Sequence, residues 1–290
     1  MSGDAPELSI VVPVYNEEEA VAGVISNIAD SGISASHEIV VVDDASSDGT
    51  GRILEKLAEE GAIRLVGHEH NRGYGAALKT GISAARSEKV IIIDGDGSYP
   101  TGHFDEFLEL SEEYDMVVGA RTTGVKEEPF LRTLVKGIII RLLKILAEID
   151  VPDLNSGLRL MKKSQVTRWF HLLPDGLSFT STITLILLSE AKPVKYVPVD
   201  YFARKGASKF SPVRDTMGIL ILIFRTMLYF NPLKVFLPVA IGLVLLAGVV
   251  AVASIFAGKF MDVTTVVILL TAVQIFVLGL LADLIAKRRQ

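Results

Sequence analysis

The sequence predicts an α/β domain with a mainly parallel sheet, followed by a hairpin of two membrane-spanning helices. Three observations lead to this prediction. Short runs of β-branched residues alternate with amphipathic segments through the first two-thirds of the chain. Polar loops follow several of these runs, at the edge where a parallel sheet binds ligands. Two long uncharged segments occupy the C-terminal part.

The alternation of strands with helices indicates βαβ units. Five short apolar runs are expected to form strands: Leu8–Val12, Glu38–Val42, Ile63–Val66, Lys89–Ile93 and Met116–Val118. The segments between them are expected to form helices: Glu17–Ala29, Gly49–Glu60, Gly75–Ala85 and His103–Ser111. Because parallel strands end at the same edge of a sheet, the loops that follow these strands should lie close together.

Two amphipathic segments lie beyond these elements. Residues 131–149 are expected to form a helix with a wide apolar face and interspersed basic residues. Such a helix either lies in the membrane interface or packs on the sheet. Residues 213–230 form a second such segment, and its position just before the hairpin favours the interface. Asn231-Pro232 then ends this helix.

Two uncharged runs, Phe236–Ala257 and Val263–Ala282, are long enough to cross a bilayer as helices. The short segment between them predicts a tight turn, so the runs form a hairpin. The alternative is a pair of buried helices in a soluble protein. Basic residues flank the outer ends of the hairpin at Lys234 and at residues 287–289, so both the N-terminal domain and the C-terminus are expected to face the cytoplasm.

Four parts are therefore expected: an α/β domain over 1–211, a juxtamembrane amphipathic helix over 212–232, the hairpin over 233–286 and a basic tail over 287–290. The net charge of −5 argues against nucleic acid as a partner. The chain has no cysteine, which excludes disulfides. Gly242 and Gly248 lie in apolar helix and would allow hairpins to associate as a homo-oligomer, although the sequence leaves the oligomeric state open.

The loop Asp94-Gly95-Asp96-Gly97-Ser98 directly follows an apolar strand. Its two carboxylates, one residue apart, are hard oxygen ligands suited to Mg²⁺ or Mn²⁺ that bridges to a diphosphate. A metal there would neutralise a departing nucleotide diphosphate. The alternative is an ordinary turn, since Asp and Gly are common turn residues.

Other polar loops would lie along the same edge. Tyr15 could stack on a base and Glu17 could accept a hydrogen bond from one. In the next loop Asp48 is expected to cap the following helix, which leaves Asp44 free to face the cleft. The glycines of Asn71–Gly75 precede a helix, a pattern typical of a backbone that approaches phosphate, although such turns are common.

Together these motifs resemble glycosyltransferase family 2. The motifs that follow the order of that family are Val12–Glu17, Asp43–Thr50, Asn71–Gly75, Asp94–Asp96 and Gly119–Arg121. Within the family, Asp153–Leu160 and Arg204–Lys209 are similar to the dolichyl-phosphate mannose synthase group of polyprenyl-phosphate glycosyltransferases. The resemblance covers about Leu8 to Lys209.

The resemblance implies a GT-A fold and an inverting, metal-dependent transfer of a hexose from GDP-mannose or a UDP-sugar to dolichyl or undecaprenyl phosphate. The nucleotide would be held by Pro13, Tyr15, Glu17, Asp44 and Asp94. The metal, Mg²⁺ or Mn²⁺, would be held by Asp94 and Asp96, with Ser98 at a position where the group often has Gln.

The resemblance also implies an acceptor site. Arg121 and Arg132 would meet the acceptor phosphate and act with Asp96 in catalysis. The remaining residues would be Arg204, Lys205 and Lys209 at the diphosphate or acceptor and Asn155, Ser156 and Arg159 around the sugar. Because a phosphate is already ionised at neutral pH, the reaction needs positioning and charge stabilisation but no protein base.

One motif points to a different reaction. Gln165-Val166-Thr167-Arg168-Trp169 matches a signature of processive polysaccharide synthases, which transfer sugar to a hydroxyl and need a base. No Glu-Asp pair occurs between Asp150 and Gln165 or near Phe179–Thr182, so we interpret the match as a helix whose Trp169 packs into the core. Transfer to a sugar or glycolipid hydroxyl is the alternative function. A non-catalytic scaffold would be expected to have lost the metal and phosphate residues, which are present.

Overall fold

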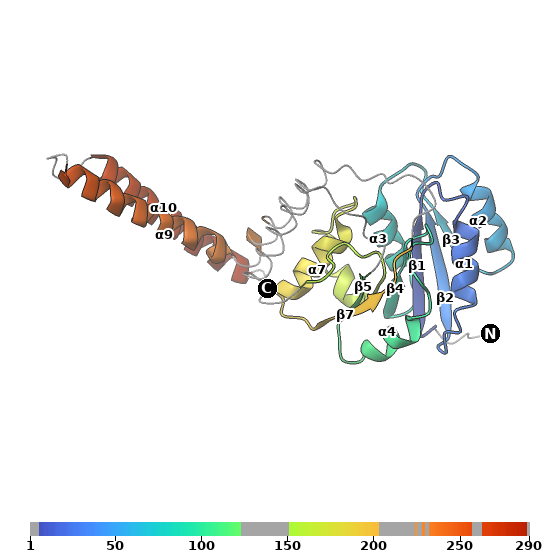
Figure 1. Ribbon diagram of the computed structural model, residues 1–290. Coiled ribbons are helices and arrows are strands. Elements are labelled where there is room, and N and C mark those ends of the chain that lie inside the picture. The colour runs from blue at the N-terminus through green and yellow to red at the C-terminus, as the bar shows by residue number, and fades with distance from the viewer. Residues whose placement is uncertain are drawn as a thin grey trace. The chain divides into compact units, whose positions relative to one another are not determined.

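A computed structural model describes residues 6–122, 151–202, 224, 228–229, 232–256 and 263–288. The strands are β1 (Leu8–Val14), β2 (His37–Asp43), β3 (Arg64–Gly67), β4 (Lys89–Ile92), β5 (Met116–Arg121), β6 (Arg159–Lys162) and β7 (Val194–Val199). The helices are α1 (Val21–Ala29), α2 (Thr50–Glu59), α3 (Tyr74–Ala84), α4 (Phe104–Leu110), α6 (Lys163–Thr167), α7 (Phe179–Ser189), α9 (Pro232–Phe256) and α10 (Val263–Arg288). The chain forms two compact units, Met1–Ile219 and Leu220–Gln290 (Figure 1).

The N-terminal unit is built on a sheet with the strand order β3-β2-β1-β4-β6-β5-β7. Strands β1 to β4 pair in parallel, and β6 runs antiparallel to both of its neighbours. The predicted mainly parallel sheet is therefore confirmed, and β6 and β7 are additions to the five expected strands. Edge strand β7 contains Pro198, a residue that an edge tolerates because one side of the strand needs no partner.

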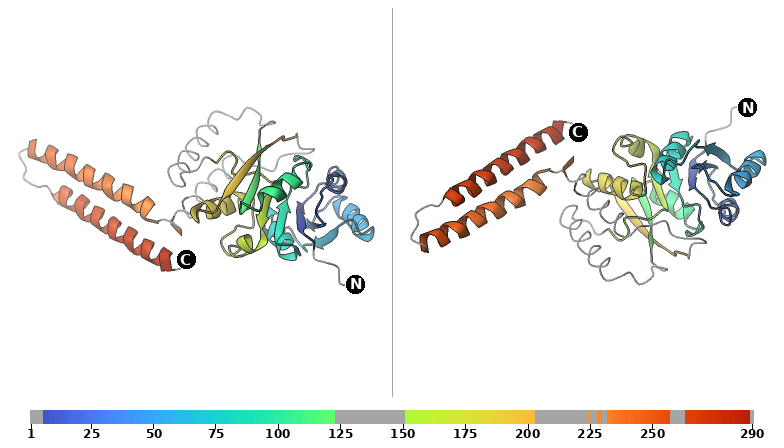
Figure 2. Two further views of the ribbon diagram at one scale, coloured as in Figure 1. Left: turned by 90° about the horizontal axis from the view of Figure 1, so that it is seen from below. Right: turned by 90° about the horizontal axis from the view of Figure 1, so that it is seen from above.

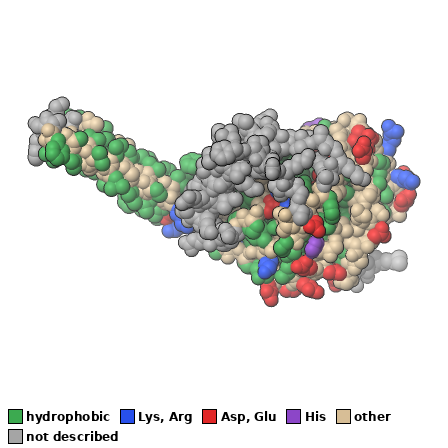
Figure 3. Space-filling model, viewed as in Figure 1, with side chains coloured by type: hydrophobic (Ala, Val, Ile, Leu, Met, Phe, Trp, Pro, Cys, Tyr) green, Lys and Arg blue, Asp and Glu red, His purple; other side chains and the backbone are tan. Residues whose placement is uncertain are grey.

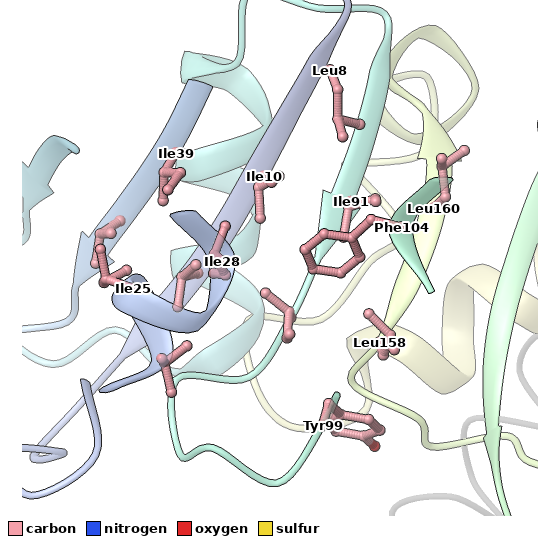
Figure 4. Packing of buried hydrophobic residues seen from close by; sticks show 14 of the residues in the cluster. Leu8, Ile10, Ile25, Ile28, Ile39, Ile91, Tyr99, Phe104, Leu158 and Leu160 are labelled. Carbon is pink, nitrogen blue, oxygen red and sulfur yellow. The ribbon is translucent and has the colours of Figure 1, made fainter. Parts of the chain in front are cut away.

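Both faces of the sheet are covered by helices, as the apolar strands require. On one face Ile10 and Ile39 pack with Ile25 and Ile28 of α1, while Phe104 of α4 joins the same cluster (Figure 4). On the other face α3 lies so close that a Cβ on Gly81 would come within 3.1 Å of Val42. This packing fixes the carboxyl ends of β1, β2 and β4 along one edge, where the polar loops emerge.

The C-terminal unit contains α9 and α10, which lie side by side and antiparallel (Figure 2). They pack through small residues spaced seven apart: Ala240, Ala247 and Ser254 on α9, and Thr265, Ala272 and Gly279 on α10. Their other faces carry large exposed apolar side chains, and hydrophobic side chains are spread along the described part of the hairpin (Figure 3). With 25 and 26 residues, both helices are long enough to span a membrane.

The glycines expected to drive self-association lie on α9 but do not form one contact surface. Gly242 and Gly248 are six residues apart, so they point about 120° away from each other around the helix. Neither has another residue within 4 Å of an added Cβ. The predicted turn of the hairpin and the two amphipathic segments at 131–149 and 213–230 lie essentially outside the described residues.

Candidate active site

The loops that follow β1 and β2 are tied together by hydrogen bonds. The Asn16 amide N–H donates to Ser46 Oγ over 2.9 Å, and the Ser47 N–H donates to Asn16 Oδ1 over 2.8 Å. The Glu17 N–H donates to Thr50 Oγ1 over 2.9 Å. Asn16 has φ +55° and Ala45 has φ +60°, strained conformations that cluster at binding sites. The pair of loops is therefore a preorganised platform at the sheet edge.

The nucleotide residues implied by the resemblance lie on or beside this platform. Pro13 is buried in β1, opposite Val42 of β2. Tyr15 and Glu17 are half-buried at the start of the first loop. Asp48 accepts a 3.0 Å hydrogen bond from the Thr50 N–H at the start of α2, although the N-cap residue of that helix is Gly49 and not Asp48 as predicted. The contacts of these residues with a nucleotide stay a prediction.

Asp44 differs from the expectation that it is free to face a cleft. Its side chain is buried, and its Oδ1 accepts hydrogen bonds from His68 Nδ1 over 2.7 Å and from the Arg72 N–H over 2.8 Å. Its Oδ2 accepts the Gly73 N–H over 2.8 Å. Asp44 therefore fastens the loop before α3 to the end of β2. The sequence did not reveal these partners because they lie more than twenty residues away along the chain.

The glycines at the start of α3 allow the backbone of residues 174–176 to pack closely against this helix. This contact argues against their interpretation as a phosphate-binding loop. A Cβ on Gly75 would lie 2.9 Å from the carbonyl oxygen of Gly176 and closer still to that of Pro174. The Ala76 N–H donates to the Asp175 carbonyl over 3.1 Å. The loop over residues 174–176 thus occupies the place where a phosphate would approach this helix.

Replacing Gly75 with alanine should therefore destabilise the N-terminal unit by about 2 kcal/mol, because the new methyl group collides with backbone that cannot turn aside. Gly23→Ala is the matched control, since Gly23 also lies in a helix but has nothing within 4 Å of an added methyl group. It should leave stability unchanged or raise it slightly. Thermal unfolding in detergent measures both. Equal melting temperatures for the two variants would contradict the packing described here.

Asp94 follows β4 and is held from two sides. The Tyr74 hydroxyl donates to Asp94 Oδ1 over 2.8 Å. Burial, and then the charge of Asp94, raise the pKa of Tyr74 well above its usual value, so this hydroxyl keeps its proton. On the other side the backbone of Gly157 passes so close that a Cβ there would lie 2.5 Å from Asp94 Oδ1. The position of this carboxylate is therefore closely constrained.

Asp96 is oriented by Ser98. Asp96 Oδ1 accepts both the N–H of Ser98, over 3.0 Å, and its hydroxyl, over 2.5 Å. Ser98 is completely buried, so the structure places it behind Asp96 as a support. Its predicted role as a metal ligand stays untested.

The donor chemistry of Asp94 and Asp96 fits a divalent cation. Both are carboxylates of one loop, and no group of three or more His, Cys, Asp or Glu side chains suited to a metal occurs in the described part of the chain. Mg²⁺ and Mn²⁺ are commonly bound by one or two carboxylates together with substrate phosphates, rather than by an all-protein cage. The two residues thus suit a metal that a nucleotide diphosphate completes.

Arg121, at the end of β5, is bound by an acid to which the sequence pattern assigned no role. Its Nε and Nη2 donate to the two carboxylate oxygens of Asp153 over 2.6 and 2.8 Å. The guanidinium also lies 5.2 Å from the centre of the Tyr201 ring. Burial alone would raise the pKa of Asp153, but the hydrogen bonds and charge of Arg121 outweigh it and lower that pKa. Asp153 is therefore a poor proton acceptor.

The Asp153→Asn variant should lose about 2 kcal/mol of stability at neutral pH, because it leaves a largely buried guanidinium without its counter-charge. Since folding lowers the pKa of Asp153, its contribution is complete above its ordinary pKa of about 3.9 and is lost as pH falls through the lowered value. The gap in melting temperature between wild type and variant should therefore shrink below about pH 4. A gap that is constant with pH would contradict this assignment.

The loop over residues 153–157 connects Arg121 to Asp94. Asp153 Oδ1 accepts the Asn155 N–H over 3.1 Å, and Asn155 Oδ1 accepts the Ser181 hydroxyl of α7. At the other end the Gly157 N–H donates to the Tyr99 hydroxyl over 2.8 Å. The predicted metal and acceptor residues are thus braced by a single segment.

Two of the three predicted sugar-site residues, Ser156 and Arg159, support this loop from the interior of the domain. Ser156 and Arg159 are completely buried. The Ser156 hydroxyl donates to the Gly119 carbonyl over 2.6 Å, while the Arg159 guanidinium donates to the carbonyls of Leu154 and Ser156, each over 2.8 Å. Ser156 and Arg159 are therefore structural supports of the loop, whereas Asn155 is exposed, and contact of these three residues with a sugar stays a prediction.

The remaining predicted cations, Arg132, Arg204, Lys205 and Lys209, lie outside the described residues. Trp169 is buried at 5% exposure, as predicted, and its indole N–H donates to Glu190 over 3.2 Å. Arg168 binds the same carboxylate over 2.6 Å. These contacts give the Gln165–Trp169 motif a packing role beside α7.

Comparison with known proteins identifies the family. Residues 9–170, more than half of the chain, match glycosyl transferase family 2, and residues 231–287 match the GtrB C-terminal hairpin. The dodecaprenyl-phosphate galacturonate synthase of Rhizobium johnstonii is 28% identical over 97% of this chain and 88% of its own length. The dolichyl-phosphate hexose transferase of Haloferax volcanii is 29% identical over 71% of this chain and 87% of its own.

Solved structures share the fold. Glucosyl-3-phosphoglycerate synthase from Mycobacterium tuberculosis, in complex with UDP, aligns with a TM-score of 0.58 and 20% identity over 76% of this chain and 80% of its own. TarS of S. aureus, in complex with UDP-GlcNAc, aligns with a TM-score of 0.57 and 19% identity over 78% and 67%. At such identities the likeness concerns the fold alone, which is GT-A. The chain belongs to glycosyl transferase family 2 and is a glycosyltransferase with a C-terminal hairpin of the GtrB type.

Proposed function

We propose that this enzyme transfers a hexose from a nucleotide sugar to the phosphate of a polyprenyl lipid, with inversion at the anomeric carbon. The observation that carries the proposal is the Arg121–Asp153 pair. Asp153 lies in the loop over residues 153–157, and Arg121 holds it ionised with a lowered pKa. An acid in that state is a weak general base. Asp153 is therefore poorly suited to activate a hydroxyl, which favours an acceptor that is already ionised, such as a phosphate monoester.

In this reaction an oxygen of the acceptor phosphate attacks the anomeric carbon, and the bond from that carbon to the nucleotide diphosphate breaks. Asp94 and Asp96 would hold Mg²⁺ or Mn²⁺, which supplies charge neutralisation to the leaving diphosphate. Arg121 would orient the acceptor phosphate, because a guanidinium presents several donors in one plane. Asp153 would hold the Arg121 guanidinium in position from the side opposite the phosphate. Tyr15, Glu17 and Pro13 would bind the nucleoside.

The names of the relatives support a lipid acceptor. Relatives from Rhizobium johnstonii, Haloferax volcanii and Pyrococcus furiosus are named for transfer of sugars to dodecaprenyl or dolichyl phosphate. The apolar hairpin would keep the catalytic unit at the membrane surface, where a lipid phosphate emerges. The basic residues at the outer ends of the hairpin would place that unit and the C-terminus on the cytoplasmic side.

Nucleotide release by the full-length protein in detergent tests this function. The donors are GDP-mannose, UDP-glucose and UDP-N-acetylglucosamine, each with and without a polyprenyl phosphate, and with Mn²⁺ or EDTA. The proposal predicts release from one donor that requires both the lipid phosphate and the metal. Release that needs a sugar acceptor instead would favour the hydroxyl-transferring alternative. Release that persists fully in EDTA would contradict the metal assignment.

A further inference from the structure

The guanidinium of Arg121 lies over an aromatic ring as well as beside Asp153. Its central carbon is 5.2 Å from the centre of the Tyr201 ring. This is within the distance of about 6 Å at which a cation is attracted to the face of an aromatic ring. The Arg121 side chain is only 27% exposed, and such an attraction is stronger when the cation is desolvated. The ring therefore restrains this guanidinium.

Strand pairing brings Tyr201 to Arg121. Val199 of β7 pairs with Arg121 of β5, and Tyr201 follows Val199 by two residues. The backbone is then fastened to the loop that carries the predicted metal ligands, because the Phe202 N–H donates to the Ser98 carbonyl over 2.9 Å. The backbone of Tyr201 is thus fixed from both sides, by the sheet and by this loop.

A second tyrosine fixes the ring itself. The rings of Tyr99 and Tyr201 meet edge to face, with their centres 5.2 Å apart and an angle of 71° between their planes. Tyr99 is buried in the main core cluster (Figure 4), and its hydroxyl accepts the Gly157 N–H over 2.8 Å. Tyr201 is half-buried and packs against the same cluster. With these contacts the Tyr201 ring has little freedom to turn, so it holds Arg121 in one place.

Asp153 and Tyr201 leave one part of the guanidinium open. Asp153 accepts hydrogen bonds from Nε and Nη2 of Arg121, and the ring covers one side of the group. Within the part of the chain that the structure describes, no hydrogen bond involves Nη1 of Arg121. Because a guanidinium carries several N–H donors in one plane, its Nη1 end can still bind the oxygens of a phosphate.

We propose that Tyr201 is a positioning residue for the lipid-phosphate acceptor: its ring holds the Arg121 guanidinium so that the Nη1 end meets the acceptor phosphate. The inference rests on the proposed function, because it requires Arg121 to bind that phosphate. Tyr201 acts through Arg121 and needs no contact with the reacting atoms. It should therefore set the affinity for the acceptor and leave the affinity for the nucleotide sugar unchanged.

Steady-state kinetics of the full-length protein in detergent tests this role. Wild type, Tyr201→Leu and Tyr201→Phe are compared with undecaprenyl phosphate, Mn²⁺ and whichever of GDP-mannose, UDP-glucose and UDP-N-acetylglucosamine the wild type uses. Leucine keeps apolar bulk but has no ring, so the KM for undecaprenyl phosphate should rise about tenfold, the effect expected for one partly desolvated contact between a cation and a ring. Phenylalanine keeps the ring and should retain most of the wild-type affinity. The KM for the donor should stay unchanged in both variants.

Tyr114→Leu is the matched control. Tyr114 is also half-buried, packs against the same core cluster and has a cation, the Lys195 ammonium, 5.7 Å from its ring centre. It precedes β5, at the opposite end of that strand from Arg121. The control should therefore leave both KM values unchanged, although it loses a comparable contact. A loss of packing would lower the melting temperature of either leucine variant without separating the KM for the acceptor from the KM for the donor.

Three results would overturn the inference. An unchanged KM for undecaprenyl phosphate in Tyr201→Leu would show that the ring does not position Arg121. An equal rise in Tyr201→Leu and Tyr201→Phe would exclude the ring as the cause, and an equal rise for donor and acceptor would indicate a structural role only. Failure of the proposed function is distinct from these results: the wild type itself would then show no release that depends on lipid phosphate, and the inference would fall with it.

Discussion

Asp96→Asn should lower kcat by about 100- to 1000-fold while the protein stays folded and membrane-bound. The substitution keeps an oxygen that can accept the N–H and hydroxyl of Ser98, which hold Asp96 in place over 3.0 and 2.5 Å. It removes the negative charge that a divalent cation requires. The loss would therefore report on the metal site rather than on the shape of the loop. Steady-state turnover with saturating donor and lipid phosphate measures it.

Two further measurements make this prediction specific. Binding of Mn²⁺ in the presence of the nucleoside diphosphate, followed by electron paramagnetic resonance, should weaken in Asp96→Asn to a similar degree. Ser98→Ala is the matched control, because it removes one hydrogen bond to Asp96 and leaves the carboxylate charge. It should cost far less activity than Asp96→Asn. Near-normal turnover or unchanged Mn²⁺ binding in Asp96→Asn would contradict the role given to this residue.

Gly157→Ala should reduce turnover by about 100-fold through displacement of Asp94. The added methyl group would lie 2.5 Å from Asp94 Oδ1, and the other carboxylate atoms are nearer still. Asp94 is short, and it accepts the Tyr74 hydroxyl, so it can move only by giving up that bond. The substitution thus moves a metal ligand without changing any charged residue.

The matched control for Gly157 is Gly102→Ala, a loop glycine with nothing within 4 Å of an added Cβ. We expect wild-type turnover from Gly102→Ala. Because overpacking also costs about 1–3 kcal/mol of stability, the melting temperature of Gly157→Ala should fall, and turnover must be measured well below that temperature. A Gly157→Ala enzyme with wild-type turnover and metal binding would show that the close approach to Asp94 has no functional consequence.

The sequence predicted those features that depend on local pattern. The five expected strands appear at their places because alternating β-branched runs between helices admit few other structures. The position of Asp94 and Asp96 at the carboxyl end of a buried strand followed from the same pattern. Trp169 was placed in the core because its motif lacks the Glu-Asp pair of a polysaccharide synthase, and the structure buries it just beyond α6.

The rest depends on contacts between distant segments. The partners of Asp44, the cover over Gly75 and the approach of Gly157 to Asp94 join residues that are far apart in sequence. The hydrophobic periodicity of a sequence carries no information about such contacts. In the sequence alone, a glycine required by a neighbouring backbone cannot be distinguished from one required by a ligand. Strand β6 was missed because Arg159–Lys162 contains no β-branched residue. Its first residue, Arg159, was expected at the sugar site, whereas the structure buries it against the backbone of Leu154 and Ser156.

The central claim is that the charge of the acceptor replaces a protein base. The most direct measurement compares two acceptors that share one polyprenyl chain, the phosphate and the free alcohol, with the same donor and metal. Products are identified by mass spectrometry of the lipid fraction. The account predicts a glycosylated lipid phosphate and no detectable glycosylated alcohol. Comparable transfer to the alcohol would contradict it, because that reaction needs a base that Asp153, held ionised by Arg121, is poorly suited to provide.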